Sequence, residues 1–278
     1  MKQNIIEFLP VVLMSTITLI VHFLDINPIH RGFFCDDQTL KYPYIESQTI
    51  PTYVCFIIWG VLAIFTIITT QIFSKSFSIK VIKNVILGAL CCILLTDITK
   101  YVTGKLRPHF LSLCDPDYDN ICFDESAYYI DDDGEALLDE FYQKYVIETE
   151  VCSMKNSELL REARLSFLSG HASFSFYFAT FIILYTNDYT QHLKWGNNIV
   201  PLIQLLVILL AAWISLTRIT DFYHHPIDVL FGAFTGISVG FYYNKIENLE
   251  KEVSHMEKFT TDEELLTDKH ISIKNSDM

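Results

Sequence analysis

Residues Thr52–Phe73 read TYVCFIIWGVLAIFTIITTQIF and contain no charged side chain. A helix needs about 20 predominantly apolar residues to cross the hydrocarbon core of a bilayer. A helix on the surface of a soluble bundle would instead show a polar, charged outer face. This stretch therefore predicts a transmembrane helix.

Five further stretches have a similar length and apolar character. Because lipid cannot satisfy backbone N–H and C=O groups, α-helices are the expected form of all six. We predict an all-α, polytopic membrane protein with six transmembrane helices and one membrane domain over residues 1–245. The other five predicted spans are approximately Phe8–Leu24, Val81–Ile98, Phe167–Thr186, Ile199–Leu216 and Ile227–Tyr243.

The net charge of −13 arises mostly outside the predicted spans. The outer loop, residues 111–164, carries fifteen Asp and Glu against four Lys and Arg, which predicts a solvated loop able to fold into a small cap. Residues 246–278 are acidic and contain few large apolar residues. This composition predicts a partly disordered cytoplasmic tail.

Lysines gather in two loops that would share one side of the membrane. Lys75, Lys80 and Lys83 lie between the second and third predicted spans, and Lys194 lies between the fourth and fifth. Because Lys and Arg are enriched in cytoplasmic loops, both termini are expected to be cytoplasmic. The first span, preceded only by Lys2, is expected to be retained rather than cleaved as a signal peptide.

Three polar islands interrupt the apolar sequence. They run from Lys100 to Pro108, from Ser169 to His171, and from Arg218 to Asp228. The six-span topology puts all three on one face of the bilayer, which is expected to be extracellular or lumenal. Histidines, an aspartate and cations on one membrane face are suited to a phosphate monoester, and a phospholipid head group would supply it.

The third island carries most of the acid–base chemistry. His224 and Asp228 are four residues apart, so a helix beginning near Pro226 could bring them together. The carboxylate could orient the imidazole and stabilise its protonated form, as a nucleophilic or basic histidine requires. His225 is three residues from the same carboxylate, so geometry alone leaves both histidines as candidates.

Cations and a helix start could bind the phosphate. Phosphoryl transfer needs charge stabilisation at the phosphate oxygens, which Lys100, Arg107 and Arg218 can supply. Free N–H groups at Ser169 and Gly170, where the fourth span begins, would also favour an anion. No metal site is expected, since the sequence has no Cys-x-x-Cys pair and no convincing set of ligands.

Two further residues of the islands are assigned by their position. His171 would stand within reach of the leaving oxygen of the substrate. Lys105 breaks no pattern and is interpreted as an interfacial lysine that holds its helix in register.

The cysteines divide between the predicted spans and the outer face. Cys55, Cys91 and Cys92 lie within spans and are interpreted as buried small hydrophobic residues. Four others are expected in an oxidising compartment, where they could form disulfides in any of three full pairings. These four are Cys35, Cys114, Cys122 and Cys152.

The islands match three motifs, and through them the chain resembles the type 2 phosphatidic acid phosphatase superfamily, in particular its animal lipid phosphate phosphatase branch. The motif Lys-x6-Arg-Pro corresponds to Lys100–Pro108. Pro-Ser-Gly-His is represented by Leu168–His171, and Ser-Arg-x5-His-x3-Asp by Thr217–Asp228. The outer run Arg31–Tyr44 also resembles this branch, so the resemblance covers nearly the whole membrane domain.

The resemblance implies a reaction without metal or cofactor. His224 attacks phosphorus and becomes a phosphohistidine, Asp228 supports it, and His171 protonates the leaving lipid oxygen before water hydrolyses the intermediate. Implied substrates are phosphatidate, lysophosphatidate, sphingosine 1-phosphate and ceramide 1-phosphate, at the plasma membrane or an endomembrane. By the same likeness, the phosphate is held by Lys100, Arg107, Ser169, Gly170 and Arg218.

Two positions depart from the family motifs. Leu168 stands in place of proline, which removes the fixed φ of proline from the turn before Ser169. Thr217 stands in place of serine and keeps a hydroxyl. Because both histidines, the aspartate and the three cations are retained, we expect an active enzyme with a less tightly defined site.

Two other functions fit parts of the sequence. A lipid phosphotransferase, such as a sphingomyelin synthase, would pass the head group to another lipid, but its motif spacing differs. A lipid or ion transporter would also carry intramembrane charges, but it would show broken helices and an internal repeat. We expect the hydrolase, with phospholipid and sphingolipid phosphates and the bilayer as partners. No nucleic acid partner is expected, and a homo-oligomer is left open.

Overall fold

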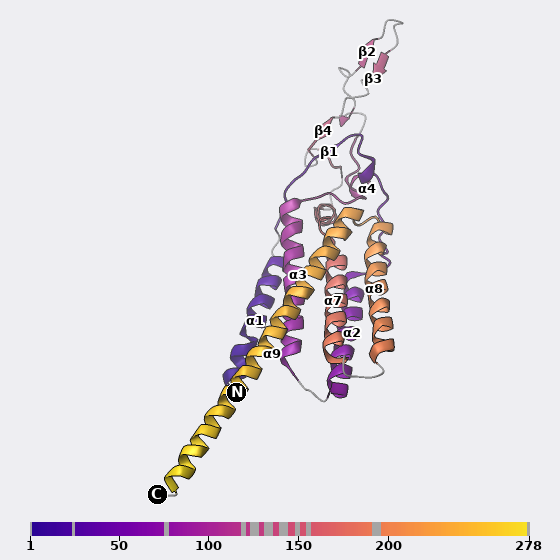
Figure 1. Ribbon diagram of the computed structural model, residues 1–278. Coiled ribbons are helices and arrows are strands. Elements are labelled where there is room, and N and C mark those ends of the chain that lie inside the picture. The colour runs from indigo at the N-terminus through magenta and orange to yellow at the C-terminus, as the bar shows by residue number, and fades with distance from the viewer. Residues whose placement is uncertain are drawn as a thin grey trace.

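A computed structural model of the chain shows an elongated helical bundle with a smaller outer region at one end (Figure 1). Within the described residues, the bundle contains six long helices, and the outer region contains short strands and helices. The residues that the structure describes are 2–23, 26–74, 78–117, 121–122, 128–130, 136–138, 144–147, 151–153, 157–190 and 196–276.

Helix α7 (Gly170–Thr190) is the central element of the bundle. Trp59 from a neighbouring helix is fully buried against it, with an indole N–H that donates to Ser175 Oγ at 2.9 Å. The contacts of α7 therefore combine apolar packing with hydrogen bonds between buried polar groups. The helices that pack on α7 are α2 (Thr52–Ser74), α3 (Lys80–Thr103), α8 (Gly196–Thr220) and α9 (Pro226–Ser276).

The close packing of α7 and α9 depends on glycines spaced four residues apart. An added Cβ at Gly232 would lie 2.6 Å from the carbonyl oxygen of Ser169, and one at Gly236 would lie 2.1 Å from that of Ser173. An added Cβ at Gly240 would lie 2.7 Å from the side chain of Thr180 on α7. Small residues let the backbones of two helices approach closely. This contact brings the first turns of α7 and α9 together at the outer end of the bundle.

Among the described residues, three helices are long and apolar enough to cross a membrane. The segments are Thr52–Phe73 in α2, Lys80–Thr103 in α3 and Ile199–Thr220 in α8. A shorter apolar stretch, Phe8–Phe23, lies in α1 (Lys2–Phe23). Phe65 on α2 is 63% exposed, as a lipid-facing side chain would be. The remaining predicted spans overlap α7 and α9, and a crossing of the bilayer by all six helices stays a prediction.

The outer region departs from the all-α fold that the sequence predicts. Its strands are short and rich in aromatic and aliphatic residues, which fit paired strands better than helices of this length. Strand β1 (Phe33–Phe34) pairs antiparallel with β4 (Tyr145–Val146), and β2 (Tyr128–Ile130) with β3 (Ala136–Leu138). Its short helices are η1 (Gln38–Leu40), α4 (Phe110–Cys114) and α6 (Ser157–Glu162).

Two disulfides and a separate small core hold the outer region together. Cys35 pairs with Cys122, and Cys114 pairs with Cys152, which selects one of the pairings that the sequence leaves open. Phe110 and Cys114 are fully buried in the core of this region. The predicted cap therefore has apolar packing of its own.

Helix α9 continues through Ser276, whereas the sequence predicts disorder from residue 246. Glu250 on this extension accepts hydrogen bonds from Lys83 Nζ at 2.9 Å and Asn84 Nδ2 at 3.1 Å, both on α3. Glu, Lys, Leu and Met are good helix formers, and the contacts with α3 give the first part of the extension a packed face.

We predict that the outer loop and the end of α9 lie on opposite sides of the membrane. The outer loop follows three crossings of the membrane, whereas the end of α9 follows six. An epitope inserted at Gly134, outside the described residues, should be accessible on intact cells or protected inside sealed microsomes. An epitope added after Met278 should show the reverse accessibility to antibody. Finding both epitopes on the same side would contradict the six-span topology.

Candidate active site

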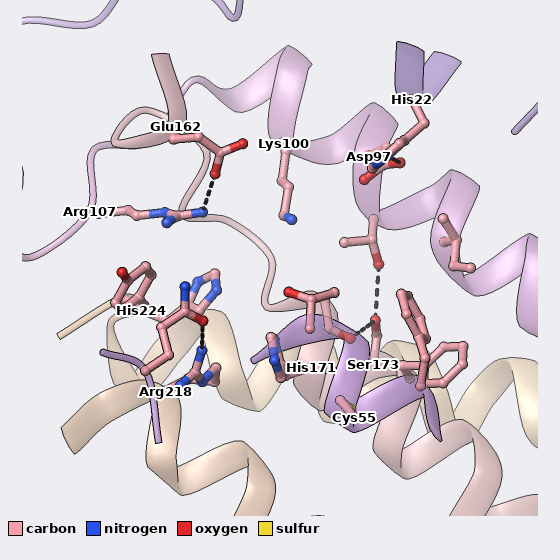
Figure 2. A pocket seen from close by; sticks show the side chains of 18 of the residues that line it. His22, Cys55, Asp97, Lys100, Arg107, Glu162, His171, Ser173, Arg218 and His224 are labelled. Atoms are coloured by element: carbon pink, nitrogen blue, oxygen red, sulfur yellow. Dashed lines mark hydrogen bonds and ion pairs between the residues drawn. The ribbon is translucent and has the colours of Figure 1, made fainter. Parts of the chain in front are cut away.

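The three polar islands meet in one cavity of about 480 Å³ at the outer end of the bundle (Figure 2). Phe56, Ile93 and Phe174 add apolar walls. Ser169 and Asp228 are fully buried beside the cavity. The other predicted site residues line it, and they are Lys100, Arg107, Gly170, His171, Arg218 and His224.

Lys100 and Arg107 reach the cavity from the two sides of a sharp turn. Lys100 lies in the last turn of α3, and its carbonyl accepts the N–H of Gly104 at 3.0 Å. Gly104 has a left-handed φ of 53°, and an added Cβ would lie 1.9 Å from the carbonyl oxygen of Ile29. Only glycine fits both conditions. The motif spacing therefore bridges a helix end, and both cations face the same space.

Tyr223 contacts both arginines of the site. The Cζ atoms of Arg107 and Arg218 lie 5.1 and 5.4 Å from the centroid of its ring, within the range of cation–π attraction. Burial raises the pKa of the Tyr223 phenol to about 12, so the ring stays neutral. Arg107 Nη2 also donates to Glu162 Oε2 at 3.1 Å, as Figure 2 shows.

Three predicted phosphate ligands have buried polar atoms without a hydrogen-bond partner in the described part of the chain. These atoms are Nε of Arg107, Nε of Arg218 and Oγ of Ser169. Each of the three residues is less than one-tenth exposed. Because a buried polar atom without a partner is costly, the set fits an anion that would supply the missing acceptors.

The buried ring of His224 is held in one tautomer. Its Nδ1 lies 2.6 Å from the carbonyl oxygen of Ser166. Since a carbonyl can only accept, Nδ1 carries the proton and Nε2 keeps its lone pair. Burial, followed by the charges of Arg107 and Lys100, lowers the pKa of His224 well below the ordinary histidine value. The neutral ring near pH 7 is the form that a nucleophilic imidazole requires.

The carbonyl of Ser166 occupies the position at His224 that the sequence assigns to Asp228. Because Asp228 lies in the first turn of α9, its carboxylate instead accepts the N–H of His225 at 3.0 Å. It also accepts Lys105 Nζ and the Ser166 hydroxyl, each at 2.6 Å. Any support from Asp228 to His224 therefore passes through Ser166. Lys105, interpreted from the sequence as interfacial, is the counter-ion of this buried carboxylate.

The two adjacent histidines occupy different environments. His225 Nε2 lies 3.1 Å from the carbonyl oxygen of Leu106. Of the pair, His224 is the one among the described residues that line the cavity. The choice that spacing alone leaves open is therefore weighted by geometry toward His224.

His171 lies in the first turn of α7, with Nε2 3.0 Å from the carbonyl oxygen of Ile50. Nε2 must carry a proton to make this bond, which leaves Nδ1 to exchange a proton with a substrate. The free N–H group predicted at Ser169 is engaged, because it donates to the carbonyl of Asp228 at 3.0 Å. Ser169 therefore offers its hydroxyl to an anion, and Gly170 lines the cavity.

The two departures from the family motifs are accommodated inside the fold. Leu168 is buried. The Thr217 hydroxyl donates to the carbonyl of Ile214 at 2.7 Å. Neither is among the described residues that line the cavity, so any effect on the site would pass through the backbone.

Sequence reasoning missed several residues that hold the site together. Acidic residues close to the motif cations could have indicated ion pairs at the site. Asp and Glu that become buried almost always have a charged partner. Ser166 gave no such signal, since its carbonyl makes the contact with His224. The missed residues are Glu162, Ser166, Asp221 and Tyr223, whereas Lys105 was considered but given an interfacial role.

Comparison with known proteins identifies the family. A family model described as the PAP2 superfamily matches residues 81–251. The chain belongs to the PAP2 superfamily. Phospholipid phosphatase 1 of Rattus norvegicus is 34% identical over 230 residues, which cover 77% of this chain and 73% of the relative. Phospholipid phosphatase 2 of Mus musculus is 31% identical over 243 residues, which cover 82% and 80%. No solved structure matches the chain. The PAP2 protein is a phosphatase.

We predict that Lys105→Met destabilises the PAP2 protein by about 3 kcal/mol, because it leaves the fully buried Asp228 without its cation. The midpoint of thermal unfolding in detergent micelles measures this loss. Lys105→Met combined with Asp228→Asn should recover part of it, since no buried charge is then left unpaired. The exposed Lys245→Met is the control and should change stability by less than about 0.5 kcal/mol. Equal effects of the two lysine substitutions would contradict the buried pairing.

Proposed function

We propose that this PAP2 phosphatase hydrolyses phosphate monoesters of membrane lipids through a phosphohistidine, without a metal ion. The observation that carries the proposal is the meeting of His171, His224 and three cations in one cavity. The apolar walls of that cavity suit a lipid, and the names of the relatives support a phospholipid. Proposed substrates are phosphatidate, lysophosphatidate, sphingosine 1-phosphate and ceramide 1-phosphate.

In the first step, Nε2 of His224 attacks phosphorus. A P–N bond forms while the bond between phosphorus and the lipid oxygen breaks. Lys100, Arg107 and Arg218 stabilise the charge on the phosphoryl oxygens. His171 takes up a proton from solvent at Nδ1 when the anionic phosphate binds beside it. The leaving oxygen then takes that proton, so a neutral lipid alcohol departs.

In the second step, water attacks the phosphorus atom of the phosphohistidine. One proton of the water passes to His171, the P–N bond breaks, and inorganic phosphate leaves. The ring of His224 becomes positively charged while it is phosphorylated. The carbonyl of Ser166, 2.6 Å from Nδ1, stabilises that charge, and Asp228 holds Ser166 through its hydroxyl.

The proposed location of the site is the extracellular or lumenal face, with both termini in the cytoplasm. The two disulfides of the outer region support this orientation, because disulfides persist in oxidising compartments. The outer region lies over one end of the bundle (Figure 1). The cavity is at the same end, because Lys100 in the last turn of α3 and His171 in the first turn of α7 line it.

Purified protein in detergent micelles should release inorganic phosphate from phosphatidate in the presence of a chelator. His224→Asn should abolish release and the trapping of radioactive phosphate on the protein, because no P–N bond can form. His225→Asn is the matched control and should keep a substantial fraction of both. Transfer of the head group to a second lipid would indicate a phosphotransferase, and the absence of both reactions would contradict an enzyme. A reversed pattern for the two histidines would exchange their roles.

The role of His171 can be tested with leaving groups of different quality. A lipid alcohol needs protonation as it leaves, whereas para-nitrophenolate is already a stable anion. His171→Ala should therefore reduce phosphatidate hydrolysis by about 10²–10⁴ and reduce para-nitrophenyl phosphate hydrolysis much less. His224→Ala should abolish both reactions. Equal losses for both substrates in folded His171→Ala protein would assign His171 to phosphate binding instead.

A further inference from the structure

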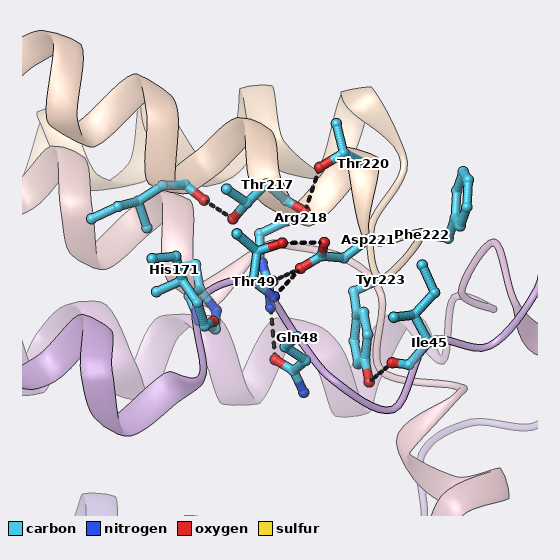
Figure 3. Close-up of polar contacts among 12 residues, drawn as sticks. Ile45, Gln48, Thr49, His171, Thr217, Arg218, Thr220, Asp221, Phe222 and Tyr223 are labelled. Atoms are coloured by element: carbon cyan, nitrogen blue, oxygen red, sulfur yellow. Dashed lines mark hydrogen bonds and ion pairs between the residues drawn. The ribbon is translucent and has the colours of Figure 1, made fainter.

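A segment before α2 contacts the active site through its backbone. We call Ile45–Ile50 the anchor segment, and Figure 3 shows it alongside the end of α8. The carbonyl oxygen of Ile45 accepts the Tyr223 hydroxyl at 3.0 Å, and that of Ile50 accepts Nε2 of His171 at 3.0 Å. The first and last residues of the segment are therefore both bound to side chains that line the cavity.

Arg218 is held on two sides. Its Nη1 donates to Gln48 Oε1 at 2.8 Å, and its Nη2 donates to Asp221 Oδ2 (Figure 3). Arg218 is 1% exposed and Asp221 is 5% exposed. The Nε atom of Arg218 has no partner within the described residues. Because both terminal nitrogens are fixed, the planar guanidinium has one orientation before any phosphate binds.

Asp221 joins Arg218 to the anchor segment. Its carboxylate accepts the N–H of Thr49 at 2.9 Å and the Thr49 hydroxyl at 2.7 Å. A carboxylate beside a phosphate-binding arginine reduces the positive charge available to the phosphate. Asp221 can therefore improve catalysis only if fixing the orientation of the guanidinium stabilises bound phosphate by more than the lost charge destabilises it. Preorganised binding groups gain affinity in this way.

The anchor segment also determines the proton position on His171. The acceptor for Nε2 of His171 is the backbone carbonyl of Ile50. This hydrogen bond therefore depends on the position of the segment and not on the side chain at position 50. With this acceptor in place, Nδ1 is the atom that gains and loses the catalytic proton. Displacement of the segment would remove the acceptor and mix the two neutral tautomers.

We propose that Asp221 and the anchor segment are positioning elements of the active site. Asp221 orients Arg218 for phosphate, and the segment fixes the tautomer of His171. Neither Asp221 nor Thr49 touches the reacting atoms in the proposed steps. The inference rests on the proposed phosphatase function and names residues that would tune it.

The test compares Asp221→Asn, Thr49→Val and Thr49→Ser in the full chain. Two measurements are made: kcat and KM for phosphatidate in detergent micelles, and the rise in thermal midpoint caused by inorganic phosphate. The thermal shift reports binding to active and inactive protein alike. Asp221→Asn should lower kcat/KM by about tenfold or more and weaken phosphate binding by about tenfold. Thr49→Val should cause a smaller loss, and Thr49→Ser should stay within about twofold of wild type because it keeps the hydroxyl.

The outer region offers a matched control. Asp37 Oδ1 accepts the N–H of Thr39 at 2.9 Å and the Thr39 hydroxyl at 2.6 Å. These are the same two threonine donors that Asp221 binds in Thr49, although Asp221 uses both carboxylate oxygens. The pair of Asp37 and Thr39 caps η1, and neither residue is among the described residues that line the cavity. Asp37→Asn and Thr39→Val should therefore leave activity and phosphate binding within about twofold of wild type.

A second variant separates positioning from general stability. In protein that already carries Arg218→Lys, the further change Asp221→Asn should have little additional effect on phosphate binding. The effects of two substitutions do not add when one residue acts through the other. Full additivity would overturn the inference. Equal losses for Asp221→Asn and Asp37→Asn would also overturn it, as would tighter phosphate binding by Asp221→Asn. Wild-type protein that neither hydrolyses phosphatidate nor binds phosphate would overturn the proposed function itself, and the inference with it.

Discussion

The close approach of α7 and α9 is the constraint on which the candidate active site depends. Gly232 faces the carbonyl oxygen of Ser169, so the two helices begin side by side. The N–H of Ser169 then reaches the carbonyl oxygen of Asp228 at 3.0 Å. One helix start supplies His171, and the loop leading into the other supplies His224. A larger side chain at Gly232 or Gly236 would collide with the backbone of Ser169 or Ser173 and push these two starts apart.

Three of the cations at the site are each paired with a carboxylate. Arg107 binds Glu162, Arg218 binds Asp221, and Lys105 binds Asp228. A buried charge without a partner costs several kcal/mol, so these carboxylates let the cations fold into the protein before a phosphate is present. Partial burial alone would raise the pKa of Glu162, but Arg107 and Lys100 outweigh it and lower that pKa, so Glu162 stays ionised.

The helices and the meeting of the motifs could be predicted because both depend on local sequence. Apolar length gives the position of a helix, and helix order puts Lys100, His171 and His224 at one end of the bundle. Hydrogen-bond partners could not be predicted in the same way. The contact between Ser166 and His224 uses a backbone carbonyl, which any residue type could provide. The spacing of His224 and Asp228 indicated a direct contact, but the helix start directs the carboxylate to His225 and Lys105.

The anchor segment lies outside the stretch of sequence that identifies the family. The stretch that identifies the family begins at residue 81, whereas Gln48 and Thr49 precede it by a whole helix. A fragment cut to that stretch would keep every motif residue but lose Gln48, which binds Arg218, and the carbonyl of Ile50, which binds His171. A chimaera that joined the N-terminal part of one relative to the C-terminal part of another would therefore have its junction within the candidate active site. The residues on the two sides of the junction would need to match.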